Sequence, residues 1–457
     1  MEKREQSTFV SSVSLWLIKI SWVVFLLSSL MISWSPAIVQ AEMKDIFSRF
    51  QPYIMAEGEY NDNINLTARN RIEDFITIIS PGIRFSTLPR AETTGQFLAP
   101  SATAEDRFGL DLDYRLGLVF YAKEEDNNFI GHSGTLSAWY SPDQRLTFRV
   151  RDILERSDEP RERDYSSGAL PGQLLLGTQR DRATYTRNVF EPSVEYRFGM
   201  ENVASLNYRY MVYRNQSRTS ENSEENFINP RITYRFDVRN SLSLDYSYTV
   251  GSFERSSDFT CHLATARYTY RFNPRTSAFI DYFFETRNFD PPSIDYRIYR
   301  PTIGAEHRFS PTLSGRIQGG YFWQNPARGS TTSGYYYDLG LTKRAERTTY
   351  ALSFVGGYTE DFFTAENRGF TKYHRALATI SHQLGQRLSI GGNTSYERAK
   401  SEPEVKDRIW GIGVNGSYQA LRWLALSLDV SHRENHAKDD DLDYSEYRTI
   451  FRITAIY

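Results

Sequence analysis

Apolar and polar residues alternate along most of the chain from about residue 50 to its end. Every second position between residues 108 and 120 is apolar: Phe108, Leu110, Leu112, Tyr114, Leu116, Leu118 and Phe120. The positions between them are mostly polar or small. Successive side chains of a β-strand point to opposite faces, so this pattern predicts long strands with one apolar and one polar face. The alternation returns at 190–198, 242–250 and 424–430.

Two kinds of connection alternate between the predicted strands. The short ones are turns at 141–144, 199–202, 237–240, 273–275, 310–312 and 385–387. The long ones are charged and lie at 62–71, 124–128, 156–182, 214–225, 325–332, 400–405 and 434–443. Short turns at one end and long loops at the other are typical of β-barrels of the bacterial outer membrane.

The short turns recur at an almost constant interval. They follow Phe198, Phe236, Phe272, Phe309, Ala345, Leu384 and Ala420, which lie 36 to 39 residues apart. Each interval fits one hairpin of two membrane-crossing strands. We therefore predict an all-β fold, a transmembrane antiparallel up-and-down barrel of 18–20 strands. The choice between the two counts depends on residues 88–107, whose pattern is ambiguous.

Residues 1–41 have the features of a signal peptide. Lys3 and Arg4 open the segment, an apolar run follows from residue 20 to 34, and Ala41 ends a Val-Gln-Ala sequence. A basic start, an apolar centre and small residues at the end are typical of a cleaved export signal. We expect a mature chain that begins at Glu42, so that residues 42–457 form the barrel. An uncleaved membrane anchor is the alternative.

The last strand ends on an aromatic residue, Tyr457. Phe451 and Ile453 lie on the same face of that strand. Barrels that the outer-membrane assembly machinery inserts typically end in this way. We therefore predict that Tyr457, Phe451 and Ile453 form the assembly signal, with this machinery and outer-membrane lipid as partners.

Composition narrows the range of functions. The net charge of −2 gives no basic footprint for nucleic acid, so no nucleic-acid partner is expected. Mean hydropathy is low at −0.53, yet 15% of residues are aromatic. Disordered chains lack such aromatic content, whereas a barrel with lipid outside and water inside requires it.

The sequence offers little for catalysis. The seven histidines show no metal-ligand spacing, and no nucleophile, base and acid occur in a recognisable arrangement. We therefore expect no cofactor, no metal and no enzymatic activity. The single cysteine, Cys261, permits no intrachain disulfide. We expect it to be a small outward-facing strand residue.

Two sets of residues repeat at the same distance from the short turns. The apolar positions predict an aromatic girdle at the periplasmic boundary of the membrane. It comprises Tyr196, Phe198, Tyr234, Phe236, Tyr270, Phe272 and Phe309. The positions between them predict a basic ring in the lumen, formed by Arg197, Arg235, Arg271 and Arg308. The alternative for these arginines is a set of wall salt bridges with Glu195, Asp245, Asp281 and Glu306.

Several segments resemble one family of outer-membrane proteins. They are the stretch from Gly58 to Ile64, the stretch from Asp74 to Phe85, and the later run from Tyr114 to Leu146. This pattern resembles the β-barrel porins encoded near bacterial exopolysaccharide and capsule loci. The resemblance implies an outer-membrane location in a Gram-negative bacterium and a role in polysaccharide export. It also implies polysaccharide and a polysaccharide-export lipoprotein as partners.

The leading functional hypothesis is a porin-like channel that serves exopolysaccharide export or passage. The alternatives are an outer-membrane enzyme and a structural or adhesive barrel with a filled interior. Loop 156–182 bears on this choice because it is the longest. It could fold inward and constrict the pore, or it could cover the outer rim of the barrel.

Overall fold

The computed structural model describes residues 49–87, 107–159, 182–199, 201–216, 220–363, 366–401, 405–437 and 443–457. These residues form twenty β-strands and one short 3-10 helix, η1 (Glu125–Asn127). The first ten strands are β1 (Phe50–Asn61), β2 (Asp74–Ser86), β3 (Phe108–Tyr121), β4 (Phe129–Tyr140), β5 (Leu146–Ser157), β6 (Tyr185–Phe198), β7 (Asn202–Asn215), β8 (Ser223–Arg235), β9 (Asn240–Phe253) and β10 (Phe259–Asn273). The others are β11 (Thr276–Phe289), β12 (Tyr296–Ser310), β13 (Leu313–Pro326), β14 (Thr332–Arg344), β15 (Thr348–Phe363), β16 (Glu366–Gln383), β17 (Leu388–Ser401), β18 (Val405–Leu421), β19 (Leu424–Ala437) and β20 (Tyr444–Ile456).

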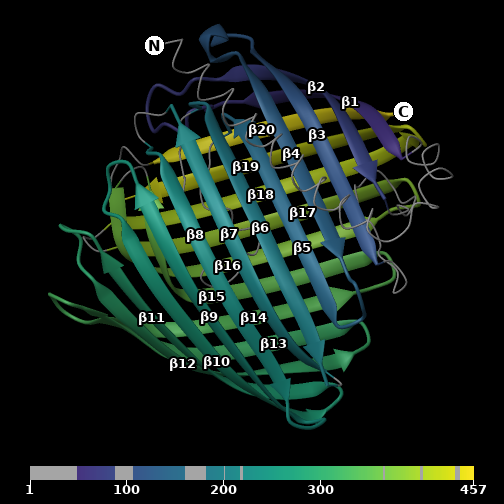
Figure 1. Ribbon diagram of the computed structural model, residues 1–457. Helices are drawn as coiled ribbons and strands as arrows, with labels where there is room; N and C mark the ends of the chain where they lie inside the picture. The colour runs from purple at the N-terminus through teal and green to yellow at the C-terminus, as the bar shows by residue number, and fades with distance from the viewer. Residues whose placement is uncertain are drawn as a thin grey trace.

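The sheet closes on itself. Each strand pairs with its neighbours in sequence, and the first strand, β1, pairs with the last, β20 (Figure 1). That final pairing is antiparallel and runs from Tyr53 opposite Ile456 to Asn61 opposite Arg448. The prediction of an all-β, antiparallel, up-and-down barrel is confirmed, and the described strands number twenty, the upper value expected. The ambiguous residues 88–106 connect β2 to β3 and lie outside the described residues, as do residues 1–48 with the predicted signal peptide.

Polar side chains at the start of the short turns explain why the chain reverses there. The Asp143 carboxylate accepts hydrogen bonds from the backbone N–H groups of Arg145 and Leu146, at 2.7 and 2.9 Å. The Asp237 carboxylate accepts equivalent bonds from the backbone N–H groups of Arg239 and Asn240. Such side chains satisfy the turn backbone locally, so five residues suffice to connect β4 to β5 and four to connect β8 to β9.

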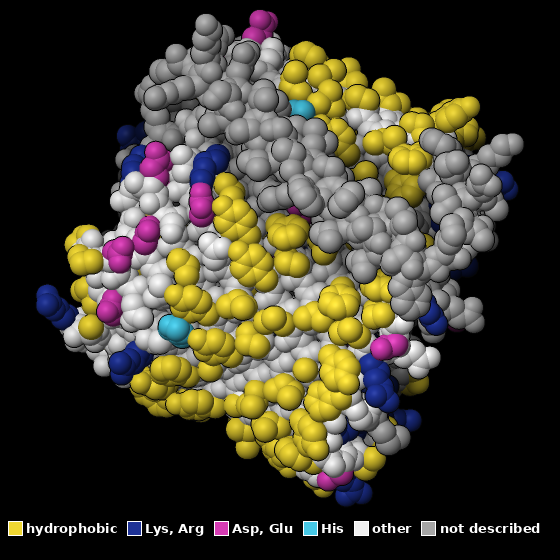
Figure 2. Space-filling model, viewed as in Figure 1, with side chains coloured by type: hydrophobic (Ala, Val, Ile, Leu, Met, Phe, Trp, Pro, Cys, Tyr) yellow, Lys and Arg dark blue, Asp and Glu magenta, His cyan; other side chains and the backbone are white. Residues whose placement is uncertain are grey.

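The two faces of the wall differ as the alternation predicts. On β11, β12 and β13 the residues Ile280, Ile303 and Ile317 are each more than half exposed and point outward. A residue adjacent to each of them points inward, and these inward residues bond to one another: the Gln318 amide donates to Asp281 at 2.9 Å and to Thr302 at 2.8 Å. Figure 2 shows apolar side chains over much of the visible outer surface. An apolar exterior and a polar interior suit a barrel in lipid.

The inner face is not polar throughout. Val189, Met211, Phe259 and Cys261 pack together on the lumen side of β6, β7 and β10. The prediction that Cys261 faces outward is therefore wrong. Its Sγ is buried and lies 3.5 Å from the Glu285 carboxylate. Cys261 shares the face of β10 that carries Arg271, so alternation along this strand already places it in the lumen. The expectation failed because it followed the apolar character of the residue and not its position in the strand.

Among the residues that the structure describes, no helix has the length and hydropathy needed to cross a membrane.

Candidate functional site in the lumen

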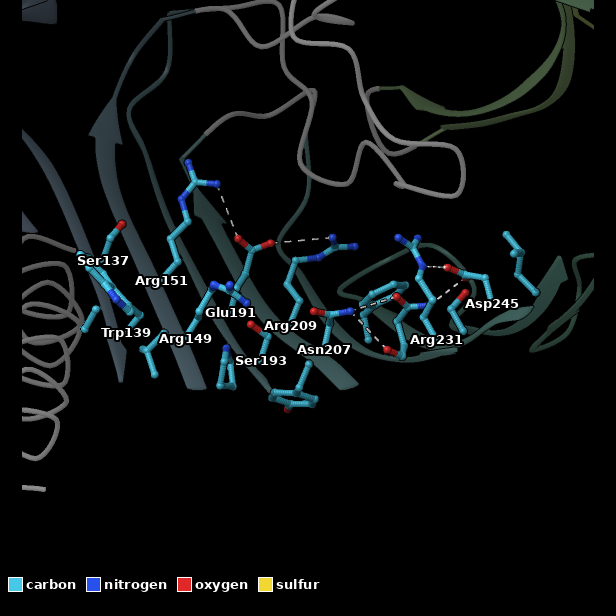
Figure 3. A pocket seen from close by; sticks show the side chains of 18 residues that line it. Ser137, Trp139, Arg149, Arg151, Glu191, Ser193, Asn207, Arg209, Arg231 and Asp245 are labelled. Atoms are coloured by element: carbon cyan, nitrogen blue, oxygen red, sulfur yellow. Dashed lines mark hydrogen bonds and ion pairs between the residues drawn. The ribbon is translucent and has the colours of Figure 1, made fainter. Parts of the chain in front are cut away.

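A row of arginines lines the lumen side of β5, β7 and β8. We call Arg149, Arg151, Arg209 and Arg231 the basic wall. Their positions on the inward face follow from the strand register, in which each lies opposite another inward residue. Each has an acidic partner: Glu195, Glu191, Glu225 and Asp245, respectively. In Figure 3 the arginine and acid side chains project to one side of the strands.

The arginines of the basic wall reach farther into the lumen than their acidic partners. The side chains of Arg149, Arg151 and Arg231 are 46%, 58% and 56% exposed. Those of Glu195, Glu191 and Asp245 are only 22%, 30% and 22% exposed. A carboxylate lies close to its backbone, whereas the long arginine stem carries its charge past it. The lumen therefore meets the positive ends of these pairs, although their net charge is zero.

A cavity of about 560 Å³ lies along the basic wall (Figure 3). Besides the four arginines, its lining includes Trp139, Ser193, Asn207 and Phe227. This volume lies within the range of small-molecule sites, which are typically about 300–1,000 Å³. The mixture of guanidinium, amide, hydroxyl and aromatic groups can contact a ligand that is both polar and charged.

Farther along the wall, on β11 to β15, aromatic rings surround an arginine. We call Phe283, Arg300, Phe322, Tyr336 and Tyr358 the aromatic cluster. The Arg300 guanidinium carbon lies 4.2 Å from the centre of the Phe283 ring and 4.3 Å from that of Tyr336. The Tyr358 ring lies 5.7 Å from the same carbon and 4.9 Å from the Phe322 ring. Cation–π contacts of this kind stabilise a desolvated guanidinium group.

The aromatic cluster exists because one hairpin leaves the wall. Strand β14 pairs with β15 only as far as Tyr337 opposite Gly356, although β15 continues to Phe363. Beyond that point β15 pairs only with β16. Tyr358 can contact lumen-facing residues of β11 and β13 only if this part of β15 lies over the inner wall. At this last pair Gly356 leaves room for the Tyr337 ring, since a Cβ there would lie 2.4 Å from that ring.

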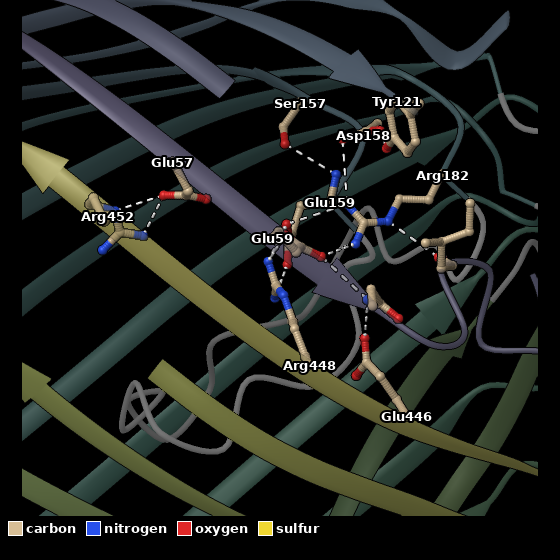
Figure 4. Close-up of polar contacts among 12 residues, drawn as sticks. Glu57, Glu59, Tyr121, Ser157, Asp158, Glu159, Arg182, Glu446, Arg448 and Arg452 are labelled. Carbon is tan, nitrogen blue, oxygen red and sulfur yellow. Dashed lines mark hydrogen bonds and ion pairs between the residues drawn. The ribbon is translucent and has the colours of Figure 1, made fainter. Parts of the chain in front are cut away.

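A third group of side chains lies at the long-loop end of the lumen (Figure 4). We call Glu59, Asp158, Glu159, Arg182 and Arg448 the mouth cluster. Arg182 donates to Glu59 at 2.8 Å, and Arg448 donates to the same carboxylate at 2.7 Å. Glu159 accepts from Arg448 at 3.0 Å and lies 3.7 Å from Arg182. Two arginines and two glutamates thus form a closed ring of ion pairs.

The mouth cluster answers part of the question about loop 156–182. Asp158 and Glu159 follow β5, and Arg182 precedes β6, yet all three lie against β1 and β20 or their neighbours. Arg182 also donates to the backbone carbonyl of Ile64 at 3.2 Å. Both stems of the loop therefore fold inward over the lumen. Residues 160–181, with the apolar positions Leu170 and Leu174–Leu176, lie outside the described residues.

Burial shifts the ionisation of one group in the mouth cluster. Burial raises the pKa of the Asp158 carboxyl from its ordinary value to about 6. The nearby Arg182 guanidinium and a hydrogen bond from Tyr121 oppose that rise, and the neighbouring carboxylates of Glu159 and Glu59 reinforce it. Asp158 is therefore the group of this cluster that titrates near neutral pH.

The four arginines of the predicted basic ring share one level near the short turns. The backbone N–H groups of Arg197, Arg271 and Arg308 each donate to a carbonyl of the preceding short turn, at 2.7 to 2.8 Å. Arg197 pairs with Glu195 at 3.0 Å, and Arg235 pairs with Glu201. Among the described residues, Arg271 and Arg308 form no ion pair. Whether the ring selects ions or braces the wall stays a prediction.

Most of the acids expected to pair with the arginines of the predicted ring pair with other arginines. Glu195 pairs with Arg197, as considered, but it also accepts from Arg149 at 3.2 Å. Asp245 pairs with Arg231 and Asp281 with Arg267, neither of which belongs to the predicted ring. Glu306 lies 4.0 Å from Arg316. The wall salt bridges therefore exist, but most of them lie deeper in the lumen than the ring.

The predicted girdle residues lie side by side on the outer surface near the short turns. Phe198 lies 6.2 Å from Tyr196 and 6.4 Å from Tyr234, measured between ring centres. Similar contacts join Tyr234 to Phe236 and Tyr270 to Phe272, and the Phe309 side chain is exposed beside them. On β20, Phe451, Ile453 and Tyr457 are exposed on the outer side. The roles of both sets in membrane anchoring and assembly stay predictions.

The sequence analysis missed the basic wall. Its signal was present: Arg149, Arg151, Arg209 and Arg231 occupy the polar positions of alternating strands. The acids that face them come from adjacent strands, however, so the register was needed to find the pairs. No group of three residues able to hold a metal ion occurs within the part of the chain that is described.

Comparison with known proteins gives one family. The model of the family described as "Putative beta-barrel porin 2" matches residues 251–456. No curated protein matches the sequence.

Several solved structures have a similar fold. The ferripyoverdine receptor of the outer membrane of Pseudomonas aeruginosa superposes with a TM-score of 0.51 at 9% identity, covering 90% of this chain and 72% of the receptor. The siderophore receptor PirA of the same species gives 0.50 at 8% identity, covering 90% and 80%. The FrpB iron transporter from Neisseria meningitidis gives 0.50 at 9% identity, covering 89% and 82%. At these identities the likeness is one of fold alone.

Proposed function

We propose that the chain is a porin-like β-barrel of the outer membrane and that it is a channel for the export or passage of exopolysaccharide. The observation that carries the proposal is a closed wall with exposed arginines along a cavity in the lumen. A barrel whose interior served only for packing would not need charged groups that project into open space.

The size of the barrel leaves both a channel and a filled barrel in consideration. Barrels of 16–18 strands leave an aqueous channel, whereas barrels of 22 strands have a plugged lumen. Here the mouth cluster and the hairpin of β15 and β16 occupy two parts of the lumen. A cavity remains along the basic wall. This arrangement supports a narrowed channel that runs along the basic wall.

A polysaccharide substrate agrees with the chemistry of that wall. Sugar hydroxyl groups require many hydrogen-bonding partners, and the cavity offers Ser193, Asn207, Asn229 and Ser247 beside its arginines. Export would also require a supply of polymer from the periplasm, for which a polysaccharide-export lipoprotein is the expected partner. Regular weak contacts along a wall permit a polymer to enter and to leave.

Planar-bilayer recording of the purified barrel tests the proposal. We expect discrete conductance steps in KCl, and a smaller current when a neutral oligosaccharide is present on one side. Absence of steps from a barrel that shows normal heat-modifiable mobility would favour the filled structural barrel. Deletion of the gene, followed by measurement of surface and secreted polysaccharide, tests the substrate separately.

A further inference from the structure

We propose that the basic wall is a binding subsite for the carboxylate groups of an acidic saccharide, such as one built of uronic acids. This inference rests on the proposed function and names its substrate class. Neutral polymers and free phosphate are the alternatives that the experiment separates.

The arginines of the basic wall retain donors for a ligand. A guanidinium group has five N–H donors in a planar fork that matches the two oxygens of a carboxylate. Arg149 contacts Glu195 through one Nη, at 3.2 Å, and Arg231 contacts Asp245 through Nε. Arg151 lies 3.8 Å from Glu191, beyond an ordinary hydrogen bond. The outer edges of these three guanidinium groups therefore face the cavity, whereas the Arg209 side chain is only 12% exposed and is held by Glu225.

The spacing of the positive charges suits a polymer that carries charge at regular intervals. Arg149 and Arg151 lie two residues apart on β5, roughly 7 Å along the strand. Arg209 lies two strands away from Arg151, about 10 Å across the sheet. Glu191 lies between them, 3.8 Å from Arg151 and 4.0 Å from Arg209. The result is a row of guanidinium groups and no isolated charge.

The surfaces between the arginines suit a sugar ring. Ser193 and Asn207 lie between β5 and β8 in the lining of the cavity and can bond to hydroxyl groups. Trp139 adds an aromatic surface at one end. Its ring covers Gly109 on β3, where a Cβ would lie 1.7 Å from the indole, so the glycine allows the ring to lie against the wall. Polar groups around one aromatic surface favour a saccharide over a small inorganic anion.

Other arginines of the lumen do not offer the same surface. In the mouth cluster the Arg182 side chain is only 4% exposed. In the aromatic cluster Arg300 lies among three rings. Along the basic wall, by contrast, the half-exposed guanidinium groups of Arg149, Arg151 and Arg231 line one cavity, which is why the subsite is assigned there.

The test uses the whole barrel and two pairs of substitutions. Arg151→Gln with Arg231→Gln removes the two most exposed charges of the basic wall. Arg375→Gln with Arg452→Gln is the matched control, because these lumen arginines also pair with one acid each, Glu397 and Glu57, on other strands. Ligands are a galacturonic acid oligomer, a neutral glucose oligomer of equal length, and inorganic phosphate.

Binding is measured by calorimetry in detergent, and block is measured as loss of current in bilayers. We expect the wild type and the control pair to bind the acidic oligomer in preference to the neutral one. The basic-wall pair should lose about tenfold or more in affinity for the acidic oligomer, since a charge-assisted hydrogen bond contributes about 1.5–3 kcal/mol. Arg151→Lys with Arg231→Lys should retain part of this affinity, because charge remains but the fork is lost.

Three outcomes would overturn the inference: equal binding of acidic and neutral oligomers by the wild type, equal loss in both Gln pairs, or binding of phosphate as tight as that of the acidic oligomer. If the Arg151→Gln and Arg231→Gln pair does not fold, the affinity of the Arg151→Lys and Arg231→Lys pair for the acidic oligomer is compared with that of the wild type. Calorimetry measures binding without any current, so the two proposals can fail separately. A barrel that binds the acidic oligomer but does not conduct would contradict the channel and leave the subsite standing. A barrel that conducts but does not bind the oligomer would contradict the subsite and leave the channel standing.

Discussion

The basic wall and the aromatic cluster both bring arginine into the lumen, but they treat its charge in opposite ways. Arg231 lies beside one short acidic side chain, and its own side chain is 56% exposed. Arg300 lies among the rings of Phe283, Tyr336 and Tyr358. An acid on the adjacent strand fixes the arginine stem and leaves its outer edge in water. Aromatic rings instead cover the group and use it to pack a hairpin.

This difference shows that the charge an arginine presents to the lumen depends on the side chains around it. Its formal charge alone does not determine this. Both regions consist of inward strand positions at similar spacing. In one, acids of neighbouring strands keep the wall open. In the other, β15 leaves its pairing with β14 beyond Gly356, and aromatic side chains pack in the space that it enters. We expect the open basic wall to control ion selectivity and the covered regions to control the width of the path.

The largest effect is expected at the mouth cluster, which covers the lumen at the long-loop end. Arg182→Ala would leave Glu59 buried with one partner fewer, and breaking a buried ion pair costs about 3–5 kcal/mol. We expect the loop stems to detach and the single-channel conductance to rise. Thermal unfolding and bilayer recording measure the two effects. Conductance equal to that of the wild type, with the stability loss present, would show that the stems do not narrow the path.

Truncating Tyr358 should uncover the aromatic cluster. Loss of a large aromatic side chain from a packed site costs about 3–5 kcal/mol, and less is expected here because Tyr358 is only partly buried. We expect Tyr358→Ala to raise conductance without changing ion selectivity. Tyr335→Ala is the control, because Tyr335 lies on the outer side of β14 and is 76% exposed. An equal effect of both variants would contradict an inward hairpin.

Ion selectivity should depend on the exposed arginines and not on the enclosed one. Arg231→Glu should move the reversal potential toward cation selectivity, whereas Arg300→Gln should leave it near the wild-type value. For the predicted ring, Arg235→Glu with Arg271→Glu should give a smaller shift in the same direction. Reversal potentials in a KCl gradient measure all three. An unchanged potential in a well-folded ring double variant would remove the ring hypothesis and favour wall bracing.

The smallest effect is expected from pH. Because the pKa of Asp158 in the docked stems is raised to about 6, above its ordinary value, the docked state binds the proton more tightly than the detached state. Docking is therefore stabilised as pH falls through 6 and weakened as pH rises above it. We expect lower conductance at pH 5 than at pH 7.5. Asp158→Asn, which resembles the protonated form, should remove this difference; a persistent difference would assign it to another group.

Much of the fold was predictable from the sequence. The alternation around Leu112 and Val194 assigns two faces to each strand, and turns such as the one at Asp237 mark the hairpins. Closure requires only that these hairpins be joined side by side. The count of twenty needed the structure, because residues 88–107 carry no clear alternation.

The site was only partly predictable. The level of Arg197 and Arg271 follows from their constant distance to a turn. By contrast, the pairing of Arg231 with Asp245 depends on register between strands, and the position of Arg182 depends on how a long loop folds. Cys261 was misassigned for another reason: its apolar character was followed, although it lies on the same face of β10 as Arg271.

The mouth cluster also constrains the order in which the barrel can be completed. Glu59 and Arg448 are 389 residues apart in sequence, and the pair forms where the first strand meets the last. Until β20 is in place, Glu59 and Glu159 lack Arg448 as a partner. Arg182 binds the same Glu59 carboxylate, so the stems of the β5–β6 loop have their complete partner set only when the seam has formed. The complete mouth cluster therefore requires a closed wall.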